Sequence, residues 1–183
     1  VADVSPSASL ANTVGGAPVL PDGTFTISGL KPGGEYRLFI NGVASNLWPE
    51  SAMLGSVDLF DGPVALRAGQ TGESLVVTFS AEHTELHGTL SGAELISPIF
   101  VIAFPVDRGQ WGLERLTRAT QPDANGHYRF ENLPAGEYWV GAIGDVDPDA
   151  WRAASFLDRL AAAAVKVVLG HGERKQLDLT TGR

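Results

Sequence analysis

The feature that most constrains the fold is an internal duplication. A stretch near the N-terminus, residues 21–39, returns in the second half of the chain as residues 122–140. Apart from one extra glycine in the first copy, the matching positions keep their spacing, and they pair Gly23 with Gly126, Phe25 with Tyr128, Ile27 with Phe130, Leu30 with Leu133 and Tyr36 with Tyr138. Further along, Val64, Leu66 and Gly69 match Val167, Leu169 and Gly172. A repeat of domain length predicts two tandem domains, residues 1–81 and 82–183, and not a solenoid of short repeats.

The repeated unit has the pattern of a β-hairpin. It opens with Asp-Gly in the first copy and Asp-Ala-Asn-Gly in the second, and both favour a turn with positive φ. Phe25 and Ile27 then alternate with polar residues, as do Tyr128 and Phe130, which is typical of a strand with one buried face. A Leu-Pro-Gly cluster ends that strand, because proline cannot donate to a ladder. The pattern predicts an all-β fold.

The motif D-x-x-G-x-[FY]-x-[FI]-x-x-L-x-x-G-x-Y, complete in the second copy, resembles the carboxypeptidase regulatory-like domain. That domain is a prealbumin-like (transthyretin-like), Ig-like β-sandwich of many bacterial secreted and surface proteins. The closing Val167-Val-Leu169 strand, its glycine turn and Leu177-Asp-Leu179 fit as well. The resemblance spans nearly all of residues 82–183 and the later two thirds of residues 1–80. It implies two tandem sandwiches at an extracellular or cell-surface location, but little about function, since sandwiches host many roles.

Composition and motifs exclude several functions. The net charge is −8 and the lysines and arginines form no cluster, which argues against nucleic acid and anionic membrane surfaces as partners. Apolar runs fall short of the roughly 18 to 20 residues that a membrane-spanning helix needs. There is no cysteine, and no nucleophile elbow, phosphate loop, dinucleotide fingerprint or zincin motif. We therefore expect no catalytic residue and no cofactor.

The first domain lacks its opening strand. Aligning Val4-Ser-Pro6 with Ala103-Phe-Pro105 places Val1 inside the second strand of the domain, so the strand expected at about residues 84–90 has no counterpart. Such a sandwich leaves a row of N–H and C=O groups unpaired. Two explanations are open. The strand lies in sequence outside this chain, which starts without Met, or a neighbouring subunit donates it at an edge near Val1 and Val4. Donation of that kind builds head-to-tail filaments.

Two long connections carry tryptophans. Residues 41–63 contain Trp48-Pro49, predicted to break the preceding strand, and Val57 and Leu59, expected to cover one end of the core. Residues 106–121 contain Trp111. Each of these tryptophans either plugs an end of its sandwich or stacks on a sugar ring of a polysaccharide. Trp139 and Trp151 are further candidates for such a surface.

The spacing His83-Thr-Glu85-Leu-His87 allows a metal site on a strand, because alternate residues share a face. The order is H-x-E-x-H, which is not the zincin order. The alternative is that the three polar side chains form the solvated face of a first strand, with Leu86 and Leu90 turned to the core.

Residues 145–164 predict one helix, placed before the last two strands of the second domain. Asp147 followed by Pro148 is a favourable helix start. The residues expected to pack on the sandwich are Trp151, Phe156, Leu157 and Leu160. The carboxylates that resemble the start of a calcium loop are Asp145, Asp147 and Asp149. Ala150 and Phe156 stand where an EF-hand needs Gly and Glu, so the choice is between helix capping and a looser calcium site.

The sequence favours a non-catalytic structural or assembly module, either part of a larger surface protein or the protomer of a filament. Its partners are then copies of itself or neighbouring domains of the parent chain. The alternatives are a carbohydrate-binding module and an accessory domain of a larger secreted enzyme.

Overall fold

The protein is all-β with two β-sandwich units. The computed structural model describes residues 2–6, 15–44, 46–67, 74–92, 99–144 and 151–180. The chain divides into two compact units, Val1–Ala81 and Glu82–Arg183. In the described parts, a single α-helix and one 3₁₀ turn accompany the strands.

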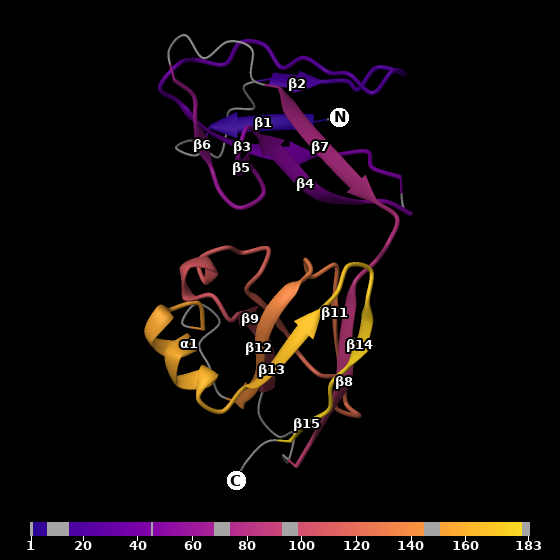
Figure 1. Cartoon of the computed structure of the whole chain (residues 1–183), viewed down its shortest axis with the longest axis vertical. Coiled ribbons are helices and arrows are strands. Elements are labelled where there is room, and N and C mark those ends of the chain that lie inside the picture. The colour runs from indigo at the N-terminus through magenta and orange to yellow at the C-terminus, as the bar shows by residue number, and fades with distance from the viewer. Residues whose placement is uncertain are drawn as a thin grey trace. The chain divides into compact units, whose positions relative to one another are not determined.

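The second unit is a sandwich of two sheets (Figure 1). One sheet has the antiparallel order β10-β9-β12-β13, formed by Arg118–Thr120, Ile99–Pro105, Gly136–Gly144 and Val165–Leu169. In the other, β8 (Glu85–Ser91) lies between β11 (His127–Glu131) and the pair β14 (Arg174–Gln176) and β15 (Leu179–Thr180). β11 is antiparallel to β8, whereas β14 and β15 are parallel to it. The first and last strands of the unit are therefore neighbours.

The core lies between these two sheets. Alternate residues of β8 and β11 point inward, so Leu86, Leu90, Tyr128 and Phe130 are buried. They pack against the inner face of β9 and β12, which includes the fully buried Val140.

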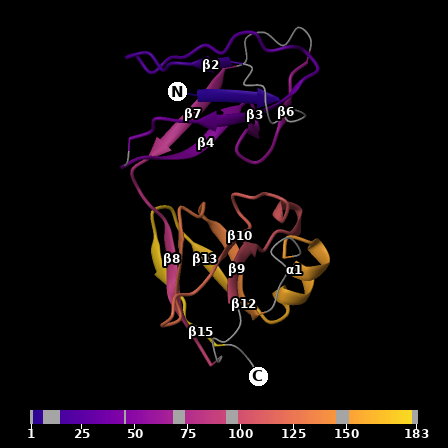
Figure 2. The same cartoon turned by 180° about the vertical axis from the view of Figure 1, so that it is seen from behind.

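The outer face of the β9–β12 sheet is buried too. The helix α1 (Ala154–Ala161) and the loop with the 3₁₀ turn Arg108–Gln110 lie on the side of this sheet away from β8 (Figure 2). The packing predicted for the helix segment is confirmed, because its apolar residues join one cluster. The members of that cluster are Ile102, Phe104, Trp111, Trp151, Leu157 and Leu160, with Phe156 at its edge.

The predicted start of the helix is wrong. The helix begins at Ala154, with Ala153 as an N-cap that makes no side-chain hydrogen bond. Asp147 and Pro148 lie outside the described residues. Three strand segments follow the helix instead of two, because the closing strand is interrupted between β14 and β15.

The first unit repeats one sheet of the second. Its order β2-β1-β3-β6 matches β10-β9-β12-β13, and the strands are Gly15–Ala17, Ala2–Pro6, Glu35–Ile40 and Val64–Ala65. The registers agree residue by residue: Tyr36 lies opposite Pro6 and Val64, as Tyr138 lies opposite Pro105 and Val167. The alignment of Pro6 with Pro105 is thereby confirmed. Because β1 corresponds to β9, the described part of the first unit contains no counterpart of β8.

The second sheet of the first unit is built differently. It has the order β5-β4-β7, formed by Val57–Asp58, Trp48–Leu54 and Leu75–Ser80. Trp48-Pro49 was expected to break a strand, yet both residues lie in β4, where an irregularity between Pro49 and Ser51 accommodates the proline. Val57 does not cover the core, since 48% of its surface is exposed, whereas Leu59 is buried as expected.

The repeated tyrosine explains the Leu-x-x-Gly-x-Tyr spacing. Tyr138 is 2% exposed and its hydroxyl donates to the Pro134 carbonyl at 2.8 Å. Tyr36 is 4% exposed, and its hydroxyl donates to the Lys31 carbonyl at 3.0 Å and accepts from the Lys31 N–H at 2.7 Å. In each unit the buried hydroxyl thus fixes the preceding turn. Burial raises the pKa of Tyr138 well above its ordinary value.

The aspartate of each repeated turn makes a testable contribution to stability. The N–H groups of His127 and Asn125 each donate to Asp123 Oδ1 at 2.8 Å, and Gly126 has a φ of 82°. The backbone hydrogen bond from His127 lowers the pKa of Asp123. Because the folded-state pKa is depressed, the stabilisation is present above the unfolded value of about 3.9 and is lost as the pH falls through the folded value.

We therefore expect Asp123→Ala to lower the melting temperature at pH 5 and above, with a difference from the wild type that disappears towards pH 2. Asp123→Asn is the matched control, since it keeps an acceptor oxygen but does not titrate; its melting temperature should show less pH dependence than that of the wild type over this range. Thermal scans followed by circular dichroism measure both. An Asp123→Ala deficit that stays constant down to pH 2 would contradict this role.

Candidate functional site

Two residues of the predicted metal spacing, His83 and Glu85, have partners outside it, whereas His87 lies near Glu85. His83 precedes β8, and its Nδ1 lies 2.8 Å from Asn132 Oδ1. Glu85 is bound by Arg174, whose Nη2 lies 3.1 Å and 3.2 Å from the two carboxylate oxygens. His87 Nδ1 lies 3.1 Å from Glu85 Oε1 but without the geometry of a hydrogen bond. Among the residues that the structure describes, no group of three or more His, Asp or Glu side chains could hold a metal ion. Asp145, Asp147 and Asp149 lie outside those residues.

The tryptophans do not form a sugar-binding surface. Trp48 is 9% exposed and Trp111 is 7% exposed. Trp111 donates from Nε1 to the Pro105 carbonyl at 2.7 Å and packs edge-on against Phe104, with ring centroids 5.5 Å apart. Trp151 is also buried, and Trp139 packs into the same cluster. Of the two alternatives for Trp48 and Trp111, burial of both rings favours packing into the interior over an exposed stacking platform.

The two units differ at the position that β8 occupies in the second unit. There, the Leu90 N–H donates to the Gly126 carbonyl, next to β11, at 2.8 Å, and the Leu177 N–H donates to the His87 carbonyl at 2.8 Å. β8 thus joins the repeated hairpin to the closing strand. In the first unit, Phe25 and Ile27 match the hairpin residues Tyr128 and Phe130, and the residues of β7 that face the core are Leu75 and Val77. No strand of the described residues lies between them.

The lack of a counterpart of β8 also explains why residues 24–30 do not form a strand. Phe25 and Ile27 were expected in a strand, but residues 24–30 adopt no regular structure. In the second unit the equivalent strand, β11, pairs with β8 and with no other described strand. Without a counterpart of β8, no described strand of the first unit offers residues 24–30 a partner for a ladder.

One edge of β7 pairs with none of the strands that the structure describes, and we call it the free edge. Ala52 of β4 uses its backbone on the side of β5, since its carbonyl accepts from the Leu59 N–H at 2.9 Å and its N–H donates to Asp58 Oδ1 at 3.0 Å. Ala52 lies opposite Val77. In an antiparallel pair the two backbone groups of a residue face the same edge, so those of Val77 point away from β4. Leu54 and Leu75 form the next such pair. The free edge is the one at which β8 would pair.

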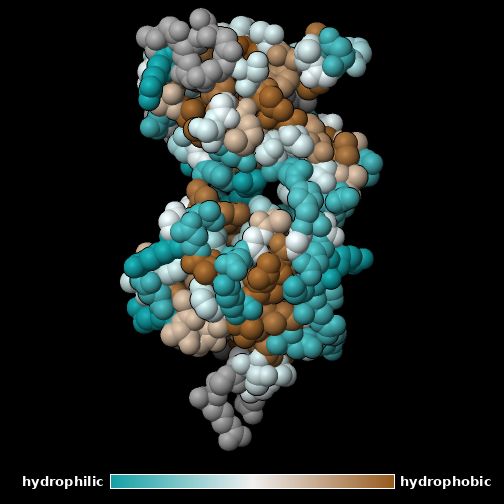
Figure 3. Space-filling view, in the orientation of Figure 1, coloured by the Kyte–Doolittle hydropathy of each residue, from teal (hydrophilic) through white to brown (hydrophobic). Residues whose placement is uncertain are grey.

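The strand at this edge is apolar at the surface. Phe79 is 38% exposed, although it shares a face with the inward Val77, and Val76 on the opposite face is 58% exposed. Figure 3 shows hydrophobic residues at the surface of the first unit along the path of β7. β7 carries neither a charged residue nor a proline, which are the usual devices that protect an edge strand.

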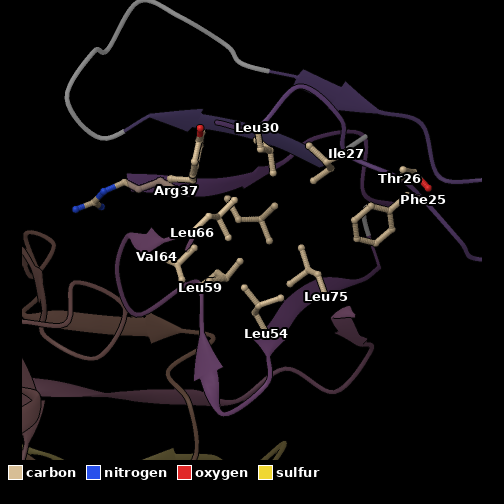
Figure 4. Close-up of a pocket in the computed structure, with 12 residues that line it drawn as sticks. Phe25, Thr26, Ile27, Leu30, Arg37, Leu54, Leu59, Val64, Leu66 and Leu75 are labelled. Atoms are coloured by element: carbon tan, nitrogen blue, oxygen red, sulfur yellow. The ribbon is translucent and has the colours of Figure 1, made fainter. Parts of the chain in front are cut away.

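Two hollows lie beside β7. The first, of about 330 Å³, is bordered by Phe25, Ile27 and Leu75, and Figure 4 shows their apolar side chains turned towards it while Arg37 extends away. The second, of about 420 Å³, is bordered by Phe25, Val77 and Phe79. Together with the free edge of β7 they form what we call the acceptor groove.

The assembly role named from the sequence for Val4 does not fit its place in the structure. Val4 lies in β1 with Gly15 on one side and Leu38 on the other, so its strand is paired at both edges. Val1 lies outside the described residues. The acceptor groove is lined by Phe25, Leu75 and Val77. The sequence signal for these residues is the lack of a counterpart of β8, because in the second unit β8 lies between the hairpin and the closing strand.

Comparisons with known proteins found similar solved structures, among them two from bacteria. No protein-family model matches the sequence, and no curated protein matches it. The Streptococcal ancillary pilin is 15% identical with a TM-score of 0.38, over 90% of this chain and 49% of that one. The Bacillus anthracis TIE protein is 13% identical with a TM-score of 0.34, over 98% of this chain and 33% of that one. The chain thus spans about half of the first and a third of the second. The resemblance to the carboxypeptidase regulatory-like domain stays a prediction. No helix in the described parts of the chain is long and apolar enough to cross a membrane.

Proposed function

We propose that this protein is a non-catalytic structural module at the cell surface or outside the cell, and that its first unit is completed by a β-strand from a neighbouring polypeptide. The observation that carries the proposal is the free edge of β7 beside an apolar groove, at the position that β8 fills in the second unit. Strand addition at such an edge supplies backbone hydrogen bonds, and the hollows supply pockets for alternate side chains. When each copy accepts a strand from the next, the copies join head to tail as a filament.

Burial supports this function over sugar binding. The tryptophans that a polysaccharide site would need are packed into the cores. By contrast, the groove residues Leu75, Val77 and Phe79 all keep part of their surface exposed. An unprotected apolar edge of this kind is an aggregation hazard unless a specific partner covers it.

Particle mass and shape test the proposal directly. Light scattering and electron microscopy of the native protein should show polymers with a regular axial repeat. Val77→Asp places a carboxylate in the acceptor groove, and we expect it to raise the concentration needed for assembly at least about tenfold, since burying an unpaired charge is costly. Val76→Asp is the matched control, because its side chain lies on the other face of β7 and it should assemble like the wild type.

A stable monomer of 19.3 kDa would contradict self-assembly. Equal assembly of the Val77→Asp and Val76→Asp variants would show that the copies meet through another surface. A strand supplied by the parent chain itself would appear as a stable monomer of the longer protein, in which the amide protons of Leu75 and Val77 are protected from exchange.

A further inference from the structure

We infer that the acceptor groove binds an extended peptide segment built like β8: two leucine-sized residues four positions apart, a glycine midway between them, and a chain direction parallel to β7. This inference rests on the proposed function for the position of the groove, and it adds the chemistry and the orientation of the strand that fills it. The argument uses the second unit as an occupied copy of the same site.

In the second unit, β8 fills its place with three inward residues. Leu86 is fully buried and Leu90 is 4% exposed, and both contribute to the core between the sheets. Gly88 lies between them on the same face, because side chains alternate along a strand. A Cβ on Gly88 would overlap the carbonyl of Leu177 and approach the Tyr128 hydroxyl to 3.1 Å. Only glycine therefore fits at the middle position.

The first unit keeps this arrangement of two spaces around one ring. Phe25 matches Tyr128 in the duplication and borders both hollows of the acceptor groove. The first hollow includes Ile27, whose match Phe130 pairs with Leu86. The second includes Gly23, whose match Gly126 accepts the hydrogen bond of Leu90. The two hollows thus correspond to the places of the two leucines, and the ring of Phe25 corresponds to the place beside the glycine.

The direction of the bound segment follows from the closing strand. Both β14 and β15 run parallel to β8, with Lys175 opposite Leu86 and Leu179 opposite Leu90. β7 closes the first unit after a segment in which Val64 and Leu66 match Val167 and Leu169 of the second unit. A segment in the acceptor groove therefore runs parallel to β7, and it starts at the end where Leu75 lies.

The test uses the full chain and a synthetic peptide with the sequence of residues 84–92, TELHGTLSG, labelled with a fluorophore. Fluorescence anisotropy should show saturable binding to the wild-type protein. We expect a peptide with Leu86→Asp and Leu90→Asp to bind at least about tenfold more weakly, because each leucine loses its apolar contact. A peptide with Gly88→Val should be weakened similarly, because the ring of Phe25 takes the place beside the glycine; unchanged binding would overturn the inferred glycine. Protein variants provide the converse: Val77→Asp should weaken binding at least about tenfold and Val76→Asp should not.

Orientation is measured with a spin label on either end of the peptide. A label at the N-terminus should broaden the amide resonance of Leu75 more than that of Phe79, and a label at the C-terminus should do the reverse. The opposite pattern would overturn the parallel orientation.

Equal binding of the wild-type and double-Asp peptides, or no binding at all, would overturn the inference. Protection of the Leu75 and Val77 amides from hydrogen exchange without any peptide would also overturn it, because the edge would then be filled by the chain itself. These results are independent of assembly. Filaments that form while the peptide fails to bind refute the inferred chemistry alone, and a peptide that binds a protein which never polymerises refutes self-assembly alone.

Discussion

Replacing Gly88 with alanine is expected to lower the free energy of unfolding of the second unit by about 3 kcal/mol or more, which is in the severe range for a single substitution. Gly88 lies at the centre of β8, where the strand is flanked on both sides. The added methyl group would overlap the carbonyl carbon and oxygen of Leu177. Because the clash is with backbone, no side-chain rotation relieves it, and β8 must move away from the closing strand.

Gly112→Ala is the matched control. A Cβ at that position has no atom within 4 Å, so the substitution should change stability by less than about 0.5 kcal/mol. Urea unfolding followed by tryptophan fluorescence measures both variants, since Trp111, Trp139 and Trp151 all report on the second unit. A Gly88→Ala protein as stable as the wild type would mean that β8 and the closing strand are not in the close contact described.

Phe104→Ala is expected to cost about 3 to 5 kcal/mol, the usual range for removing a buried phenylalanine. The ring is fully buried on the outer face of β9 and packs edge-on against Trp111. Its loss opens a cavity beneath the helix α1, and the fluorescence of Trp111 should shift as its environment changes.

Phe39→Ala serves for comparison, because that ring is 51% exposed and its removal should alter stability by less than about 0.5 kcal/mol. Thermal unfolding followed by circular dichroism distinguishes the two. Equal losses for both variants would contradict the assignment of Phe104 to a packed cluster.

Much of the fold was predictable from the duplication. The repeat is a local pattern, and it led to the alignment of Pro6 with Pro105, which the equivalent pairings of these prolines with Tyr36 and Tyr138 confirm. The connection around Trp48-Pro49 was not predictable in the same way. Its strand, β4, is stabilised by β7, which is distant in sequence, and the local signal of the proline indicated a break instead.

From the sequence we could predict that the first unit lacks a strand, but not where in the unit the gap lies. Counting strands showed that the first unit lacks one, yet the chain terminus suggested that the gap lies beside Val4. The structure pairs Val4 on both edges, and the gap lies between Phe25 and Val77. The metal spacing failed for a similar reason. Glu85 is bound by Arg174, a contact between residues far apart in sequence, which alternation along one strand cannot reveal.

The parallel pairing of the first and last strands has a mechanical consequence. When the second unit is pulled at its two ends, the force enters β8 at Glu85 and leaves β15 at Thr180, in opposite directions along neighbouring parallel strands. All hydrogen bonds between them are then loaded in shear at the same time, instead of opening one by one from an end. This geometry resists tension. The first unit has no such clamp among its described strands, and it would gain one when a strand comes to lie along β7.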